Sequence, residues 1–231
     1  MQPEQFVLDL ARSESPSFDN FVAGDNREPI AALRALCASA LPENGILLWG
    51  AAGAGKSHLL RAAAALAATV RPVIECASPH DTPSIANVPP AALVVVDALD
   101  SADAVAQGRL FTLINQLPPR GGQWIAAATS PPALLALRDD LRTRVALGLV
   151  FEIVPLADKD KPVALAAYAH ERGFRLSDDV IAYLLAHGRR DMPTLVATLA
   201  ALDRHSLATR RPVTVPMLRG WLQRDAGLSG D

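Results

Sequence analysis

The residues best suited to chemistry form one glycine-rich stretch, GAAGAGKS at residues 50–57. Glycines let successive backbone N–H groups curl around a phosphate. Lys56 offers a cation to the β- and γ-phosphate oxygens, and the Ser57 hydroxyl is a suitable ligand for Mg²⁺. The stretch follows an apolar run, Ile46–Trp49, and opens an alanine- and leucine-rich segment, 58–69. Strand, loop and helix in this order predict a P-loop, with the positive end of the helix facing the same anion.

A carboxylate is expected beside this loop. The apolar run Ala91–Val96 indicates a strand buried on both faces, and Asp97 follows it directly. Because ligands of open α/β sheets bind at the carboxyl ends of strands, Asp97 is placed to hold the water shell of Mg²⁺. Many ATPases of this type have a second carboxylate next, to orient the attacking water, but here the residue is Ala98. Asp100 is open to two interpretations, an interface residue or a plain surface aspartate, and the pattern favours the second.

The bulk composition restricts the class of protein. The chain has 231 residues, half of them hydrophobic, and a net charge of −2. That is enough for one large domain or two small ones, and the charge does not indicate a nucleic-acid-binding module. Cys37 and Cys76 lack C-x-x-C spacing, which argues against zinc and for a reducing compartment. Without a secretory segment or a long apolar run, we expect no membrane association and a cytoplasmic location.

Alternating apolar and helical patterns predict an α/β sheet in the first two thirds of the chain. Between residues 78 and 90, proline and polar residues indicate a loop with at most one short turn. The expected strands are 46–49, 72–76, 91–96, 124–129 and 149–154, and the expected helices are 29–40, 58–69, 104–117 and 138–146.

The last third of the chain has a different pattern. Residues 155–162 combine proline, alanine and alternating charges, which indicates a linker. Four helices are expected beyond it, with starts at Ser177-Asp178-Asp179 and Asp191-Met192-Pro193 supported by capping residues. A P-loop α/β domain followed by a small helical bundle accounts for this order of elements. The expected helices are 161–172, 177–187, 192–208 and 215–225.

Three further sites have two interpretations each. In the segment SFDNFVAGDN, residues 17–26, two aromatics either cover an adenine or attach the segment to the core. Thr129 ends a strand and either senses the nucleotide or caps a helix that begins at Ser130-Pro131-Pro132. Arg142 and Arg144 are two residues apart on a helix, so they point in different directions, and one can be structural while the other faces outward.

Near the N-terminus, residues 5–10 (QFVLDL) combine a glutamine with alternating apolar side chains. In an extended conformation such a segment can fill a pocket on a partner. Equally, it can be an N-terminal strand or a frayed tail, and spacing alone favours this second interpretation.

Taken together, these motifs resemble the AAA+ family and, within it, the DnaA/Hda branch. The resemblance covers nearly the whole chain. It implies an α/β fold, a P-loop AAA+ parallel five-stranded sheet flanked by helices, followed by a small all-helical lid domain. The stretches that carry it are SFDNFVAGDN (17–26), the P-loop (50–57), VVVDALD (94–100), DLRTR (140–144), DMPTL (191–195) and RPVTVPML (211–218).

The resemblance also implies roles for individual positions. Phe21 and Val22 lie where such proteins contact adenine, and Thr129 falls at the sensor 1 position. Arg144 matches the arginine finger, a catalytic residue that acts in trans in the site of a neighbouring subunit. Ser57 and Asp97 take the Mg²⁺ roles. The implied contacts to ADP or ATP are Phe21, Val22, Gly50, Ala51, Ala52, Gly53, Ala54, Gly55, Lys56, Ser57, His58 and Thr129.

At the N-terminus, the resemblance favours partner binding. Residues 5–10 match the hexapeptide by which such proteins dock onto the DNA polymerase III β sliding clamp, with contacts from Gln5, Phe6, Leu8 and Leu10. We therefore expect a clamp-binding segment at 1–16, an AAA+ nucleotide-binding domain at 17–156 and a helical lid domain at 157–231.

Two departures from the family pattern bear on activity. Ala98 removes the second acid, and Pro193 stands where the sensor 2 arginine of the lid is expected. Proline has no cation for a phosphate, and Arg189 or Arg190 is a less favoured substitute. Both changes weaken a self-sufficient ATPase cycle but leave nucleotide binding intact, with ADP as the resting ligand by resemblance.

The expected function is therefore that of an adaptor near the replisome and nucleoid. It binds an adenine nucleotide and Mg²⁺, docks on the clamp and stimulates ATP hydrolysis by DnaA, which restrains initiation of replication. DnaA has a further DNA-binding domain, and this sequence ends at Asp231, so we expect no sequence-specific DNA binding. Self-association is left open. The alternatives are a self-contained AAA+ ATPase that loads or remodels, a truncated DnaA-like initiator, and a scaffold with a degenerate P-loop.

Overall fold

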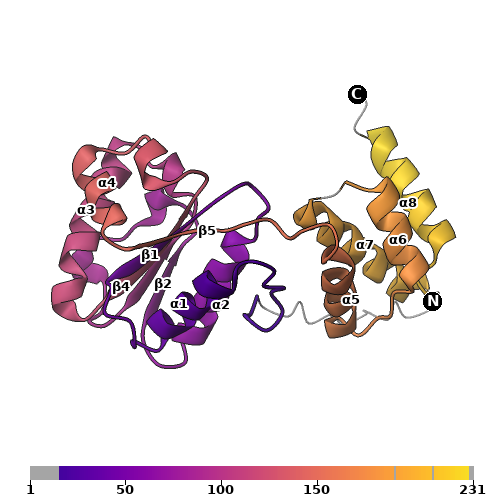
Figure 1. Cartoon of the computed structure of the whole chain (residues 1–231), viewed down its shortest axis with the longest axis horizontal. Helices are drawn as coiled ribbons and strands as arrows, with labels where there is room; N and C mark the ends of the chain where they lie inside the picture. Colours follow the sequence, from indigo (N-terminus) through magenta and orange to yellow (C-terminus); the bar gives the residue numbers. More distant parts are fainter. Residues whose placement is uncertain (1–15, 190, 210, 229–231) are drawn as a thin grey trace, which may run out of the picture. The chain divides into compact units, whose positions relative to one another are not determined.

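The structure is a computed structural model that describes residues 16–189, 191–209 and 211–228. Contacts within the chain divide it into two compact units, residues 16–160 and the residues from 161 onward. Figure 1 shows an α/β unit and a helical unit, and each is described by itself below.

A five-stranded parallel sheet forms the centre of the α/β unit, in the order β2-β3-β4-β1-β5. The predicted fold class is thus confirmed. The last strand is two residues shorter than expected at its carboxyl end. The strands are β1 (Gly45–Trp49), β2 (Val73–Cys76), β3 (Leu93–Val96), β4 (Gln123–Ala128) and β5 (Leu149–Glu152).

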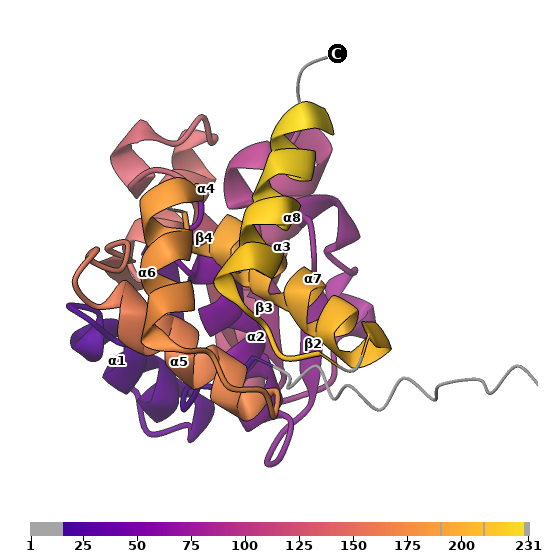
Figure 2. The same ribbon diagram turned by 90° about the vertical axis from the view of Figure 1, so that its right-hand side faces the viewer.

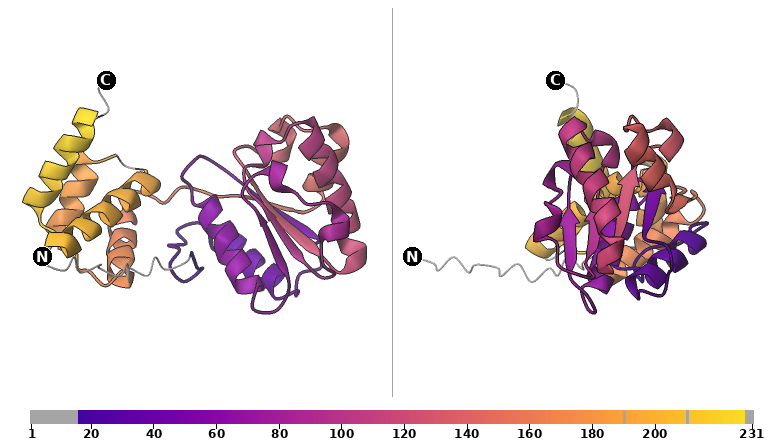
Figure 3. Two further views of the ribbon diagram at one scale, coloured as in Figure 1. Left: turned by 180° about the vertical axis from the view of Figure 1, so that it is seen from behind. Right: turned by 90° about the vertical axis from the view of Figure 1, so that its left-hand side faces the viewer.

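Helices cover both faces of this sheet (Figures 1 and 3). Side chains alternate between faces along a strand, so Ile46 and Leu48 of β1 pack with the α1 and α2 side, while Leu47 packs with the α3 and α4 side. All three are fully buried, which explains why β1 is a continuous apolar run. The helices are α1 (Arg27–Cys37), α2 (Lys56–Ala67), α3 (Ala104–Gln116) and α4 (Asp139–Ala146).

Helix boundaries differ from expectation where the backbone turns sharply. α1 ends at Cys37 instead of residue 40, and Ser39 shortly beyond it has a left-handed φ of 54°. α2 begins two residues earlier than expected, at Lys56, because Gly55 adopts the left-handed conformation that stops the loop and starts the helix.

Two local predictions were wrong. The segment between residues 78 and 90 contains two short 3₁₀ helices, Pro79–Asp81 and Ile85–Asn87, instead of one turn at most. The first is stabilised by a capping box, in which Ser78 and Asp81 each accept a backbone N–H from the other end of the turn. After β4, no helix is capped by Thr129. The element that follows is a 3₁₀ helix, Pro132–Leu134, with Pro131 and not Thr129 at its N-cap.

Four helices make up the second unit, α5 (Lys161–Glu171), α6 (Asp178–His187), α7 (Met192–Thr209) and α8 (Val215–Leu228) (Figure 2). α5 packs on α6 and α7, and α8 packs on α6 and α7. Their core is mostly leucine and valine, and the unit also contains a part-buried ion pair, Arg172 Nε to Asp203 Oδ2 at 3.5 Å. None of the helices in the described residues is long and apolar enough to cross a bilayer.

Candidate functional site

The glycine-rich loop leaves the carboxyl end of β1 in a conformation that needs glycine. Gly50, Gly53 and Gly55 have φ angles of 147°, 79° and 101°. A Cβ atom at Gly50 would lie 2.5 Å from the Ile153 carbonyl oxygen, and one at Gly55 would lie 2.6 Å from the Phe21 ring. The loop is therefore a closely packed backbone cradle, of the kind that holds a phosphate group with its N–H groups.

Lys56 directs its ammonium group at this cradle. Its Nζ donates hydrogen bonds to the carbonyl oxygens of Gly50 at 2.6 Å and of Ala51 at 2.9 Å. Burial lowers the pKa of Lys56, while the charges of Asp97 and Asp100 act in the opposite direction. A cation held among oxygen atoms at the start of a helix fits a phosphate-binding loop.

Two carboxylates lie at the carboxyl ends of the neighbouring strands. Asp97 is half-buried, and its Oδ1 accepts the Ala98 N–H at 2.8 Å. Asp100 Oδ1 accepts the Thr129 N–H at 2.9 Å. Asp100 is exposed, in agreement with its interpretation as a surface aspartate, and its hydrogen bond to Thr129 is a contact that the sequence did not indicate. Ala98 adopts a left-handed conformation, with φ 51°, and the 3₁₀ helix Leu99–Ser101 follows it, so the chain turns back and brings Asp100 to the end of β4.

Mg²⁺ would have few protein ligands at this edge of the sheet. The described residues contain no cluster of three or more histidine, cysteine or acidic side chains that could hold a metal ion. Mg²⁺ keeps several waters and is usually bound by one or two protein groups together with substrate phosphates. Ser57 and Asp97 therefore fit Mg²⁺ as partners of a bound nucleotide and not as an independent metal site.

The aromatic segment before α1 lies directly on the phosphate loop. The Phe21 ring contacts Gly55 and lies 5.4 Å from the His58 ring, centre to centre. His58 Nε2 forms a 2.9 Å hydrogen bond with the Ser17 carbonyl, and burial lowers the pKa of His58. Val22 is half-buried. The structure thus brings Phe21 together with Gly55 and His58, while Val22 is its sequence neighbour.

The two aromatic residues of the segment have different surroundings. Phe18 is buried in the core, and the Arg34 guanidinium lies 4.9 Å from its ring centre. Phe21 is only partly buried. Phe18 therefore attaches the segment to the core, whereas Phe21 is the one of the two that lies against the loop.

Asn26 is a structural residue of this site that the sequence interpretation missed. Its side chain is 3% exposed. Its Nδ2 donates to the Val154 carbonyl at 2.9 Å and its Oδ1 accepts the Val154 N–H at 2.8 Å. From its place before α1 it resembles a helix cap, but its side chain makes no capping hydrogen bond. It instead joins the segment before α1 to the chain just after β5.

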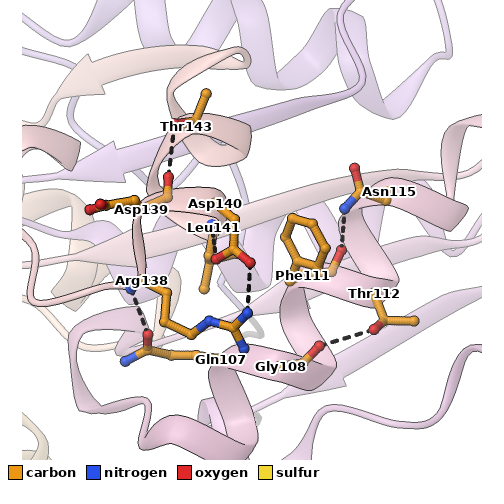
Figure 4. A network of polar contacts seen from close by, with 10 residues as sticks. All are labelled: Gln107, Gly108, Phe111, Thr112, Asn115, Arg138, Asp139, Asp140, Leu141 and Thr143. Atoms are coloured by element: carbon orange, nitrogen blue, oxygen red, sulfur yellow. Dashed lines mark hydrogen bonds and ion pairs between the residues drawn. The ribbon is translucent and has the colours of Figure 1, made fainter.

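Arg144 lies on α4, whose start is fixed to α3 by a polar network (Figure 4). The Arg138 N–H donates to Gln107 Oε1 at 2.8 Å, and the Arg138 guanidinium pairs with Asp140 at 2.7 Å. Arg142 pairs with Asp139. By contrast, Arg144 is exposed, and its guanidinium has no hydrogen bond or ion pair within the described part of the chain. The two arginines therefore do differ in surroundings, as their spacing predicts.

The structure places Arg144 away from the phosphate loop of its own chain. It lines a hollow of about 320 Å³ together with Gly45 and Trp124, near the amino ends of β1 and β4. The phosphate loop begins at the opposite end of β1, and the 5 residues of that strand span about 15 Å. Arg144 therefore cannot act on a ligand held by its own loop.

Other predicted positions lie elsewhere or outside the described residues. Gln5, Phe6, Leu8 and Leu10 are outside them, as is Arg190.

Pro193 is the second residue of α7, in the first turn where helix N–H groups have no intrahelical partner. Asp191 precedes this helix, and its Oδ1 accepts the Thr194 N–H at 3.0 Å. Arg189 is exposed and pairs with Asp191 at 3.5 Å.

Comparison with known proteins gives two family matches and a set of similar structures. The family described as the lid domain of Hda matches residues 158–222, and the bacterial DnaA ATPase domain matches residues 13–75. Domain III of the DnaA replication initiation protein from Thermotoga maritima is 18% identical, with a TM-score of 0.78 over 90% of this chain and 95% of that chain.

Two further structures are similar over most of the chain. AMPPCP-bound DnaA from Aquifex aeolicus is 24% identical, with a TM-score of 0.68 over 84% of this chain and 66% of that chain. A mutant of the Thermotoga maritima RuvB protein is 16% identical, with a TM-score of 0.69 over 90% of this chain and 71% of that one. At these identities the structures show a shared fold only. The two family matches indicate similarity to Hda and DnaA in particular.

Proposed function

We propose that this chain is an AAA+ protein related to DnaA and Hda, and that it is an adaptor that stimulates ATP hydrolysis by DnaA; the two family matches and the shared fold support this. The adaptor acts with an adenine nucleotide bound and while docked on the DNA-loaded sliding clamp. Its action would lower the amount of ATP-bound DnaA and so restrain initiation of replication. The observation that carries the proposal is the position of Arg144, exposed and at the opposite end of β1 from its own phosphate loop.

The nucleotide site supports the first part of this proposal. The N–H groups of the loop and the Lys56 ammonium would hold the phosphates, and Ser57 and Asp97 would hold Mg²⁺. Phe21 and Val22 come from the segment that lies on the loop, next to where the base would bind. The similar DnaA structure from Aquifex aeolicus contains AMPPCP, which supports an adenine nucleotide here.

Arg144 supports the second part. Arginine has five N–H donors and a charge that does not titrate at neutral pH, so an exposed arginine without a partner is suited to a phosphate on another molecule. The polar network at the start of α4 fixes the helix that carries Arg144. This favours a defined orientation of Arg144 relative to the α/β unit. In well-studied GTPases, an arginine supplied in trans accelerates hydrolysis by about 10³- to 10⁵-fold.

The same geometry argues against a self-contained ATPase. Ala98 has no carboxylate and therefore cannot orient an attacking water. Its left-handed backbone turns the chain into the 3₁₀ helix Leu99–Ser101. Pro193 offers no cation from α7. Measurable ATP turnover by the isolated chain, independent of DnaA and of the clamp, would support the self-contained alternative.

Docking on the clamp is the third part and rests on the sequence of residues 5–10. A clamp loaded on DNA would hold the adaptor near DnaA bound to the same DNA. Tethering raises the effective concentration of a partner to about the millimolar range for short linkers, so weak direct contacts between the adaptor and DnaA would suffice.

The test is hydrolysis of DnaA-bound ATP, measured with and without clamp loaded on DNA. We expect stimulation by the chain only when loaded clamp is present. The double substitution Gln5→Ala and Leu8→Ala should abolish both clamp binding and stimulation. Asp9→Ala is the matched control, since it alters the same segment but not the predicted apolar or glutamine contacts.

If the chain never stimulates DnaA, with or without clamp, the proposed function is wrong. If the double variant still binds clamp, the docking segment is wrongly assigned, whatever the effect on DnaA.

A further inference from the structure

Trp124 lines the hollow that also holds Arg144, near the amino end of β4. It is the second residue of that strand, and only 2% of its surface is exposed. The indole ring packs between two glycines. A Cβ atom at Gly45 would collide with the ring, with Nε1 among its nearest atoms, and one at Gly148 would lie 3.1 Å from the ring atom Cζ2. Backbone on two sides therefore restricts the orientation of the indole.

The indole N–H of Trp124 has no acceptor in the described part of the chain. The backbone N–H of Trp124 donates to the Asn44 carbonyl at 3.0 Å, but Nε1 makes no hydrogen bond there. Among the described residues, the one side-chain polar atom that is both enclosed and unpaired is Arg71 Nε. Nε1 of Trp124 therefore reaches open space, which is the hollow that Trp124 lines. Because buried indole N–H groups usually have a partner, this donor points to an acceptor on another molecule.

The other side chains of the hollow favour a neutral acceptor on a protein over an anion. Arg144 and Glu43 both line it, and their opposite charges leave little net attraction for an anion inside it. Leu147, which is 69% exposed, adds apolar area that a protein segment would cover. Arg144 itself is exposed, so its guanidinium can extend beyond the hollow toward a phosphate.

We propose that Trp124 is a positioning residue for the action of Arg144 in trans. Its indole N–H donates a hydrogen bond to a neutral oxygen of DnaA, a backbone carbonyl or a side-chain amide, and so seats the hollow on DnaA with Arg144 beside the bound ATP. A donor held between two glycines defines a docking position more sharply than an exposed arginine does alone. This inference rests on the proposed stimulation of DnaA and deepens it, since it names a residue of the contact between the two proteins.

The substitution Trp124→Phe removes the indole N–H and keeps an aromatic ring between the glycines. We measure hydrolysis of DnaA-bound ATP against the concentration of the full chain, with clamp loaded on DNA. Loss of one neutral hydrogen bond should raise the concentration that gives half-maximal stimulation by about 3- to 10-fold, and the rate at saturation should keep its wild-type value. Trp221→Phe is the matched control, the same substitution at a half-buried position of the helical unit, and should change neither quantity.

Fluorine NMR tests the same contact without altering Trp124. The chain has three tryptophans, Trp49, Trp124 and Trp221, so labelling with 5-fluorotryptophan gives three resonances. The variants Trp49→Phe and Trp221→Phe assign them. When unlabelled ATP-bound DnaA and loaded clamp are added to the labelled wild-type chain, the Trp124 resonance should shift and the Trp221 resonance should stay in place.

A wild-type half-maximal concentration in Trp124→Phe would overturn the role of Trp124, as would an equal rise in Trp221→Phe. A lower rate at saturation with an unchanged half-maximal concentration would also overturn it, because it would show a disturbed Arg144 and not a lost contact. If circular dichroism shows that Trp124→Phe does not fold, the labelled wild-type chain decides, and an unmoved Trp124 resonance would overturn the role. A wild-type chain that gives no stimulation would instead remove the proposed function, and this inference with it.

Discussion

Lys56 is the residue on which the nucleotide site depends most. Its ammonium group lies against the carbonyl oxygens of Gly50 and Ala51, within a loop whose glycines have left-handed backbone angles. The loop could be predicted from the sequence because all its determinants are local, a spacing of glycines followed by lysine and serine. The environment of Asp100 could not, because it depends on a left-handed alanine and on a bond to the end of another strand.

The prediction at this scale concerns Lys56→Ala. Loss of a charged hydrogen-bond donor to phosphate should weaken ADP binding about 10- to 100-fold, as measured by calorimetry. Lys159→Ala removes the same charge from an exposed position in the segment after β5 and should leave binding unchanged. Equal affinities of Lys56→Ala and the wild type would show that the loop does not hold the phosphates.

At the scale of elements, the segment before α1 is held by contacts with three parts of the α/β unit. Phe21 contacts the phosphate loop, the Ser17 carbonyl bonds with His58 on α2, and Asn26 bonds with Val154 just after β5. These contacts hold the segment against the phosphate loop and the start of α2. They also join the segment to the chain just after β5.

Asn26→Ala tests the importance of this connection for stability. The substitution removes both part-buried hydrogen bonds between the Asn26 side chain and the Val154 backbone, so the free energy of unfolding should fall by about 2 kcal/mol. Urea denaturation followed by circular dichroism is the measurement. Asp25→Ala, at the exposed preceding residue, is the control and should change stability little. A loss of less than about 1 kcal/mol in Asn26→Ala would mean that other contacts hold the segment.

The strands and most helices could be predicted from periodicity, whereas this connection could not. The apolar runs of β1, β3 and β4 are buried on both faces and therefore visible in the sequence. Asn26 and Val154 are 128 residues apart, and nothing local to either residue indicates the partner. The two 3₁₀ helices between residues 78 and 90 were missed for a similar reason, since their composition is that of a loop.

At the scale of the whole molecule, the α/β unit has its two proposed sites at opposite ends of β1. The carboxyl ends of β1 and β3 hold the phosphate loop and Asp97, while the amino end of β1 lies beside Arg144. Under the proposed function, the molecule binds one nucleotide itself and presents an arginine to another molecule. The four-helix unit from residue 161 onward is matched by the family described as the lid domain of Hda, and Pro193 stands where the family resemblance predicts an arginine.

The most direct test of the account is the rate of DnaA-bound ATP hydrolysis, with clamp loaded on DNA, in the presence of Arg144→Ala. We predict loss of stimulation by about 10³-fold or to the unstimulated rate, with clamp binding and ADP binding unchanged. Arg142 is on the same helix but pairs with Asp139. As the control, Arg142→Ala should retain stimulation. Full stimulation by Arg144→Ala would contradict the central claim that this arginine completes the catalytic site of DnaA.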